Sequence, residues 1–170
     1  MKKIFLLLSL TILLSGCYAN ENNDGFKGNN DNYKGKNLDI GVVGNELPDI
    51  SNVNYRYVKL NEIFKNNNIN FDALIITSDE FEEADNPKYV QFFDKVTYPV
   101  IFFGEKDFRM FAFTNENMSI ENSKDNNDSF IEGFRNIDDE REGMKFYKFD
   151  ENDTDVDMLV RLFNYLDNLD

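Results

Sequence analysis

Apolar residues gather in short runs along this chain, and the first run differs from all the others. Residues 4–14 are nearly all Leu, Ile and Phe, follow Lys2 and Lys3, and lead into small residues before Cys17. A run of about 11 residues is too short to cross a hydrocarbon core, which needs roughly 20. A charged start, a short apolar stretch and a small-residue end are the three parts of a secretory signal peptide.

Beyond residue 37 the pattern changes to runs of β-branched and aromatic residues separated by polar turns. These runs predict strands at residues 38–44, 55–60, 71–77, 99–103, 108–113 and 144–149. Two lysines on the outer face of the last run favour an edge strand there. Residues 115–128 are polar and rich in Asn, which predicts a long surface loop.

Helices are predicted between these runs from capping residues and apolar spacing. Two short elements are expected first, a helix from Asn61 to Lys65 and an acidic turn after Ser78 or Asp79. Asn86 followed by Pro87 has the cap-plus-Pro pattern of a helix start. Two more helices are expected from Ser129 to Phe134 and from Thr154 or Asp153 to Leu166. The last is the best defined, because its apolar residues recur at helical spacing and acids crowd its first turn.

Alternating strands and helices predict an α/β fold, a three-layer sandwich with a mainly parallel sheet in the flavodoxin or Rossmann manner. Residues 71–103 form its clearest unit, a strand–helix–strand segment with a parallel pair. An alternative is a thioredoxin-like fold, because residues 99–103 followed by 108–113 resemble the hairpin after the cis-proline of that family. The chain has no Cys-x-x-Cys motif, so thioredoxin redox chemistry is excluded in either case.

The four residues Leu14-Ser15-Gly16-Cys17 resemble the lipobox of bacterial lipoprotein precursors. The resemblance implies cleavage between Gly16 and Cys17, a diacylglyceryl group on Cys17, and anchoring at the extracytoplasmic face of the cell membrane. Cys17 is the chain's single cysteine, so no intrachain disulfide can form. An ordinary signal peptide followed by a chance cysteine is the alternative.

The anchor divides the chain into three predicted parts. Residues 1–16 are the signal peptide, residues 17–37 a lipidated tether, and residues 38–170 a single folded domain. The tether is rich in Asn, Asp, Gly and Lys, and it holds too few apolar residues to offset its ordering entropy, so we expect it to be disordered.

The net charge is −14, and removal of Lys2 and Lys3 with the signal peptide brings the mature chain to −16. Such an anionic body argues against a nucleic-acid partner, which requires a basic patch. Its acidity indicates solubility and self-repulsion, or attraction of a cationic ligand or a basic protein partner.

Candidate chemistry is limited because the chain contains no histidine. With Cys17 acylated, carboxylates are what remains for acid–base work or for a hard metal. Asp153, Asp155 and Asp157 mimic the start of a calcium loop, but the required Gly and Glu are absent further on, so helix capping explains them better.

Ligands of open α/β sheets bind at the carboxyl ends of strands. The polar residues at those ends, which we take as candidate ligand-binding residues, are Asn45, Glu46, Ser78, Asp79, Glu80 and Glu105. If the three ends converge, they form an acidic cleft for a cationic small molecule or a divalent ion; otherwise they are solvated loops. No catalytic residue, resident metal or cofactor is assigned.

The leading hypothesis is therefore a membrane-anchored extracytoplasmic lipoprotein whose domain binds or scaffolds a partner without catalysis. The alternative is a carboxylate- or metal-dependent hydrolase of the cell envelope that uses Asp79, Glu80 and Glu46.

Overall fold

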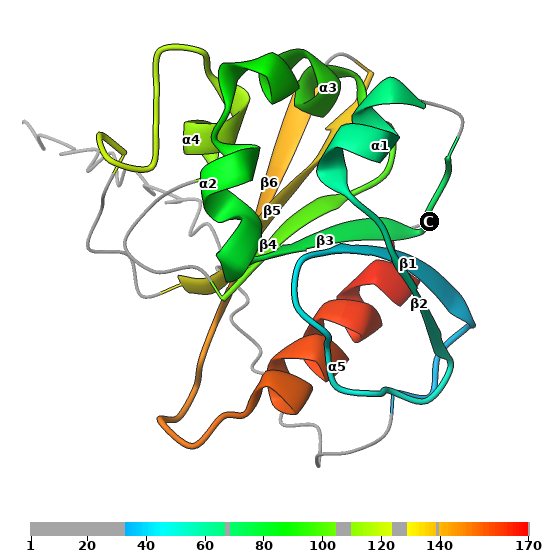
Figure 1. Cartoon of the computed structure of the whole chain (residues 1–170). Helices are drawn as coiled ribbons and strands as arrows, with labels where there is room; N and C mark the ends of the chain where they lie inside the picture. The colour runs from blue at the N-terminus through cyan, green and yellow to red at the C-terminus, as the bar shows by residue number, and fades with distance from the viewer. Residues whose placement is uncertain (1–32, 67–68, 105–109, 124–128, 139, 170) are drawn as a thin grey trace, which may run out of the picture.

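A computed structural model gives the fold, and it describes residues 33–66, 69–104, 110–123, 129–138 and 140–169 (Figure 1). The predicted signal peptide and most of the predicted tether lie outside these residues, as does Glu105. Within the described residues, no helix is both long enough and apolar enough to cross a membrane.

One six-stranded sheet in the order β2-β1-β3-β4-β5-β6 forms the centre of the molecule. Its strands are β1 (Leu38–Val43), β2 (Val53–Tyr57), β3 (Ala73–Thr77), β4 (Val100–Phe103), β5 (Ser129–Ile137) and β6 (Glu140–Tyr147). The first four pair in parallel, whereas β4–β5 and β5–β6 are antiparallel. The parallel pairing of β3 with β4 confirms the parallel pair predicted within residues 71–103. The position of β6 at the sheet edge confirms the edge strand predicted around residues 144–149.

The predicted mainly parallel three-layer sandwich is wrong, because the sheet is mixed and its C-terminal half is antiparallel. The backbone N–H of Gly104, just after β4, donates to the carbonyl of Phe130 at 3.0 Å. β5 therefore starts beside the end of β4 and runs back along it. β6 then follows through a tight reversal at Asp138, which has a φ of +46°, and a tight reversal can only join antiparallel strands.

Two further predictions are wrong for related reasons. Residues 129–134, predicted as a helix, begin the nine-residue strand β5, whose central residues are buried against β4. Residues 111–113, the end of the strand predicted at 108–113, lie instead in the short helix α4 (Phe111–Thr114). The thioredoxin-like alternative needed a strand there, directly after β4, so it is overturned together with the parallel sandwich.

The remaining helices of the described segments are mostly short. They are α1 (Leu60–Lys65), α2 (Phe81–Ala84), α3 (Val90–Lys95) and α5 (Asp155–Asp167), with single 3₁₀ turns at Ser78–Glu80 and Pro87–Tyr89. The predicted cap at Asn86 is confirmed, since its side chain accepts from the Lys88 N–H. Thr154 likewise caps α5, in a reciprocal capping box with Asp157.

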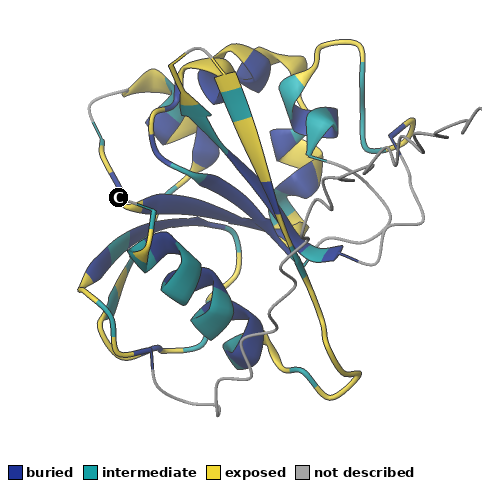
Figure 2. Cartoon of the chain, turned by 180° about the vertical axis from the view of Figure 1, so that it is seen from behind, coloured by how far each residue is buried: buried dark blue, intermediate teal, exposed yellow. Residues whose placement is uncertain are grey.

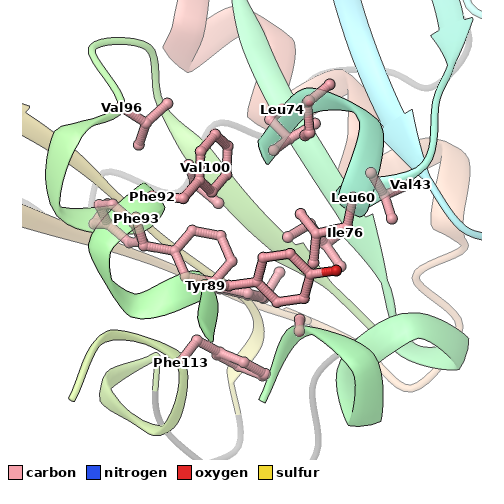
Figure 3. Close-up of a cluster of buried hydrophobic side chains, with 14 of the residues drawn as sticks. Val43, Leu60, Leu74, Ile76, Tyr89, Phe92, Phe93, Val96, Val100 and Phe113 are labelled. Atoms are coloured by element: carbon pink, nitrogen blue, oxygen red, sulfur yellow. The ribbon is translucent and has the colours of Figure 1, made fainter. Parts of the chain in front are cut away.

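Alternate residues of the central strands enter two separate cores, one on each face of the sheet. On one face, Leu74, Ile76 and Phe102 pack against the short helices α1 to α4. Figure 3 shows the aromatic part of this core, where Tyr89, Phe93 and Phe113 lie together. On the other face, Ile75 and Ile101 pack against the apolar stripe of α5. The inner strands are buried throughout (Figure 2). The outer surfaces of α1, α2 and α3 are exposed, whereas that of α5 is mostly half-buried.

The described chain enters the domain through a short segment, residues 33–37, that we call the entry strap. Tyr33 is 1% exposed and packs edge-on against Phe163 of α5, with ring centroids 6.0 Å apart. Its hydroxyl donates to the Lys36 carbonyl at 2.9 Å, and the Lys36 N–H donates to Asp167 at 3.1 Å. Burial, with the charge of Asp167, raises the pKa of Tyr33 to about 12. The strap is thus part of the packed domain, although the composition of residues 17–37 predicts a disordered tether.

Candidate functional site

The carboxyl ends of β1, β3 and β4 lie along one edge of the sheet, because these strands are parallel neighbours. We call it the carboxyl edge. A glycine with positive φ directly follows each of β1 and β4, Gly44 at +112° and Gly104 at +82°. At Gly44 a Cβ atom would lie 2.0 Å from the Thr77 hydroxyl oxygen. Glycine there allows the chain leaving β1 to turn close against the end of β3.

A small hydrogen-bond network joins the ends of β1 and β3. The Asn45 N–H donates to the Thr77 Oγ1 at 2.8 Å and to the Asp79 Oδ1 at 3.3 Å. The Thr77 hydroxyl in turn donates to the Asp79 Oδ1. Two of the residues singled out from the sequence, Asn45 and Asp79, therefore lie within hydrogen-bond distance of each other. Thr77, which carries the network, was not among the candidates.

An open pocket of about 370 Å³ adjoins this network. It is lined by Val43, Gly44, Val58, Lys59, Leu60, Asn61, Asp79, Glu80 and Glu83. Three carboxylates from the segment after β3 thus share the pocket with the one ammonium group of Lys59. Asn61 supplies an uncharged amide.

Glu83 is held in place from the aromatic core below the pocket. Its Oε1 accepts from the Tyr89 hydroxyl at 2.5 Å and from the Lys88 Nζ at 2.9 Å. The hydrogen bond from Lys88 lowers the pKa of Glu83 most, and the bond from Tyr89 lowers it further. The carboxylate is therefore ionised well below neutral pH and keeps its negative charge at the pocket wall.

The other sequence candidates lie at the same edge with fewer contacts. Ser78 lies near the end of β4, since a Cβ on Gly104 would be 3.5 Å from its Oγ. Glu46 is exposed. Glu105 lies outside the described residues.

Sequence reasoning missed Glu83, Lys59 and Asn61 at this pocket. A helical reading of the residues after Ser78 could have found Glu83, because positions three and four apart share a helix face and it stands at that spacing from Asp79 and Glu80. No local pattern indicates Lys59 or Asn61, which reach the pocket through the pairing of β2 with β1.

The acidic run before α5 is occupied by internal contacts. Asp153 accepts from the Phe149 N–H at 2.6 Å and from the Arg161 guanidinium. Burial opposes ionisation of Asp153, but these bonds and the charge of Arg161 outweigh it and lower its pKa. Asp157 caps the helix through Thr154. This confirms the predicted helix capping by the run.

Nowhere in the described segments do three or more His, Cys, Asp or Glu side chains gather as they would around a metal ion. The carboxyl-edge pocket can offer a bound molecule negative charge and hydrogen-bond acceptors from Asp79 and Glu80, whereas Glu83 is already paired with Lys88.

A second pocket of about 380 Å³ lies at the opposite end of the strands, lined partly by Phe64, Phe92 and Tyr98. Burial raises the pKa of Tyr98 to about 12, so its hydroxyl stays protonated at physiological pH. Lys95 is the one charged residue of its lining. No sequence signal pointed to this pocket.

Comparison with known proteins identifies the start of the chain. Residues 1–17 match a family model described as a prokaryotic membrane lipoprotein lipid attachment site. The chain is a lipoprotein precursor. The lipoprotein is anchored to the membrane through Cys17, as the lipobox residues predict. No curated protein and no solved structure matches the chain, so the comparisons leave the lipoprotein's folded domain without a family.

Proposed function

We propose that this lipoprotein is an extracytoplasmic binding module whose ligand site is the carboxyl edge of the sheet. Asn45, Glu46, Ser78, Asp79, Glu80 and Glu105 are the proposed binding residues, and a cationic small molecule or the basic surface of a protein is the proposed ligand. The observation that carries the proposal is the pocket of about 370 Å³, whose lining includes Asp79 and Glu80 without ion-pair partners among the described residues, Glu83 paired with Lys88, and Lys59.

Charge and hydrogen bonding support this assignment together. Asp79 is positioned by Thr77 and Asn45, and Glu83 by Tyr89 and Lys88, so two of the carboxylates are oriented before a ligand arrives. Glu46, Asp79, Glu80 and Glu82 have no ion-pair partner among the described residues, which leaves their charge available. A net charge of −16 on the mature chain would also speed encounter with a cation.

The binding hypothesis is favoured over the hydrolase hypothesis because the chain lacks the residue types that most often act as a general base or a nucleophile. It has no histidine, and its one cysteine is the lipidation site. The hydrolase hypothesis would need an acid and a base among carboxylates alone, and no observation in the described residues favours it.

The test is a titration of the full mature lipoprotein in detergent micelles with spermidine, a hexalysine peptide and Ca²⁺ at low salt. We expect saturable binding of at least one polycation, weakened about tenfold in the double variant Asp79→Asn, Glu80→Gln. Asn and Gln keep the shape and one acceptor oxygen of each side chain while removing its charge.

The matched control is Asp138→Asn with Glu140→Gln, which removes the same charge at the opposite end of the sheet. Equal weakening in both double variants would mean that only the net charge matters, and the proposed site would be lost. Binding of Ca²⁺ alone, sensitive to Asp79→Asn, would instead favour the metal-dependent alternative.

A further inference from the structure

The chain enters its domain at one end of the parallel strands, and the proposed site lies at the other. The entry strap precedes β1, which starts at Leu38, and Gly44 of the carboxyl edge follows its last residue, Val43. A six-residue strand is about 20 Å long. In Figure 1 the blue start of the described chain lies toward the side marked C, whereas the orange loop before α5 lies on the opposite side.

The strap fixes this entry point firmly. Tyr33 is buried against Phe163, the Asn52 side chain donates to the Gly35 carbonyl at 3.2 Å, and Lys36 bonds to Asp167. Any pull from the lipid therefore acts at the end of the sheet where β1 begins, which we call the amino edge. Fifteen residues, 18–32, separate Cys17 from Tyr33.

Charge is distributed unequally between the two edges. At the amino edge, Arg135 pairs with Glu142 and Arg141 pairs with Asp94. The exposed lysines Lys34 and Lys95 offset part of the charge of the exposed acids there, which are Asp72, Asp138 and Glu140. At the carboxyl edge, Glu82 and the other acids of the segment after β3 are joined by the exposed Asp150 and Glu151 after β6. An anionic bilayer repels the carboxyl edge more strongly than the amino edge.

We propose that the amino edge is the membrane-facing surface of the domain and that the carboxyl edge points away from the bilayer. The attachment point and the charge distribution both favour this orientation. The inference rests on the proposed extracytoplasmic placement, and its consequence is that a ligand reaches the proposed site from the side remote from the lipid.

The test labels single introduced cysteines. Cys17 is the only native cysteine and its thiol is lipidated, so each introduced cysteine carries the one reactive thiol of its variant. The variants Lys34→Cys and Lys95→Cys label the amino edge, and Glu82→Cys and Glu151→Cys label the carboxyl edge; all four positions are exposed. The full lipidated chain would be reconstituted in vesicles containing about one quarter phosphatidylglycerol. Each labelled variant carries a fluorophore, and lipids with a headgroup nitroxide quench it.

We expect at least twofold stronger quenching at both amino-edge positions than at both carboxyl-edge positions. Equal or reversed quenching would overturn the proposal. Melting temperatures of the labelled variants check that each remains folded. The readout needs no ligand, so a failure here leaves the proposed binding site standing, and a failure of polycation binding leaves the orientation standing.

Discussion

Asp85 shows what one side chain contributes at the residue scale. It follows α2, and its Oδ2 accepts from the Ile120 N–H at 3.1 Å, which joins the loop of residues 115–123 to the helix. Its other carboxylate oxygen, Oδ1, is buried without a hydrogen-bond partner. Burial raises the pKa of Asp85, against the smaller opposite effect of the Ile120 bond. The folded protein thus binds the Asp85 proton more tightly than the unfolded chain does.

The sign of the pH dependence follows from this raised pKa. The protonated side chain stabilises the fold fully below the unfolded pKa, near 3.9, and that stabilisation is lost as pH rises through the higher folded pKa. We predict that Asp85→Asn unfolds at higher urea concentration than wild type at pH 7, with the difference shrinking toward pH 4. A variant less stable than wild type at pH 7 would contradict the prediction; Asp138→Asn, at an exposed position, is the control.

At the element scale, β5 has the largest effect on the topology of the sheet, because the strand pairing changes from parallel to antiparallel where β5 joins β4. Its Gly133 faces β4 so closely that a Cβ atom would lie 2.7 Å from the backbone carbonyl oxygen of Val100. Backbone atoms of a central strand cannot move aside without breaking the ladder. In the next strand, a Cβ on Gly143 would meet the end of the flexible Met110 side chain at 2.9 Å.

We predict that Gly133→Ala destabilises the domain by about 1–3 kcal/mol through overpacking. Gly143→Ala is the matched control and should cost less than about 1 kcal/mol, because Met110 can change rotamer. Urea unfolding of both variants measures the difference. Equal stability losses would show that the close approach of β5 to β4 is not the constraint.

At the scale of the whole molecule, the lipid attachment site and the folded domain are separate parts of the chain, and the entry strap leads into the domain. The match at residues 1–17 establishes the attachment. The entry strap is held to the domain by the packing of Tyr33 on Phe163 and by the hydrogen bond from the Lys36 N–H to Asp167. Because each buried CH₂ contributes about 0.8 kcal/mol, two or more acyl chains hold such a protein stably on a membrane.

We predict that Cys17→Ala abolishes fatty-acid incorporation and leaves either an uncleaved precursor or a protein released from the membrane. Metabolic labelling with a radioactive fatty acid and detergent phase partition measure the two effects. Asn20→Ala, three residues further along, should behave as wild type. Unchanged labelling and partition in Cys17→Ala would refute the assignment of the anchor.

The candidate site illustrates why sequence reasoning reaches only part of the way. Asn45, Asp79 and Glu80 could be selected because strand ends were visible in the apolar pattern. Their partners Thr77 and Lys59 could not be selected from the sequence. Thr77 is placed by the pairing of β1 with β3, which joins segments more than 30 residues apart. Lys59 is placed by the pairing of β2 with β1, which joins segments more than 10 residues apart.

The sequence by itself determined the features that depend on neighbouring residues. These are the lipid attachment site at Cys17, the caps at Asn86 and Thr154, the buried stripe of α5, and the parallel β3–β4 unit. Only the tertiary structure decided the direction of β5 and β6, the burial of Tyr33, and the meeting of Asn45 with Asp79. The reason is that strand direction and side-chain burial depend on pairings between distant segments, which periodicity and capping along the chain do not encode.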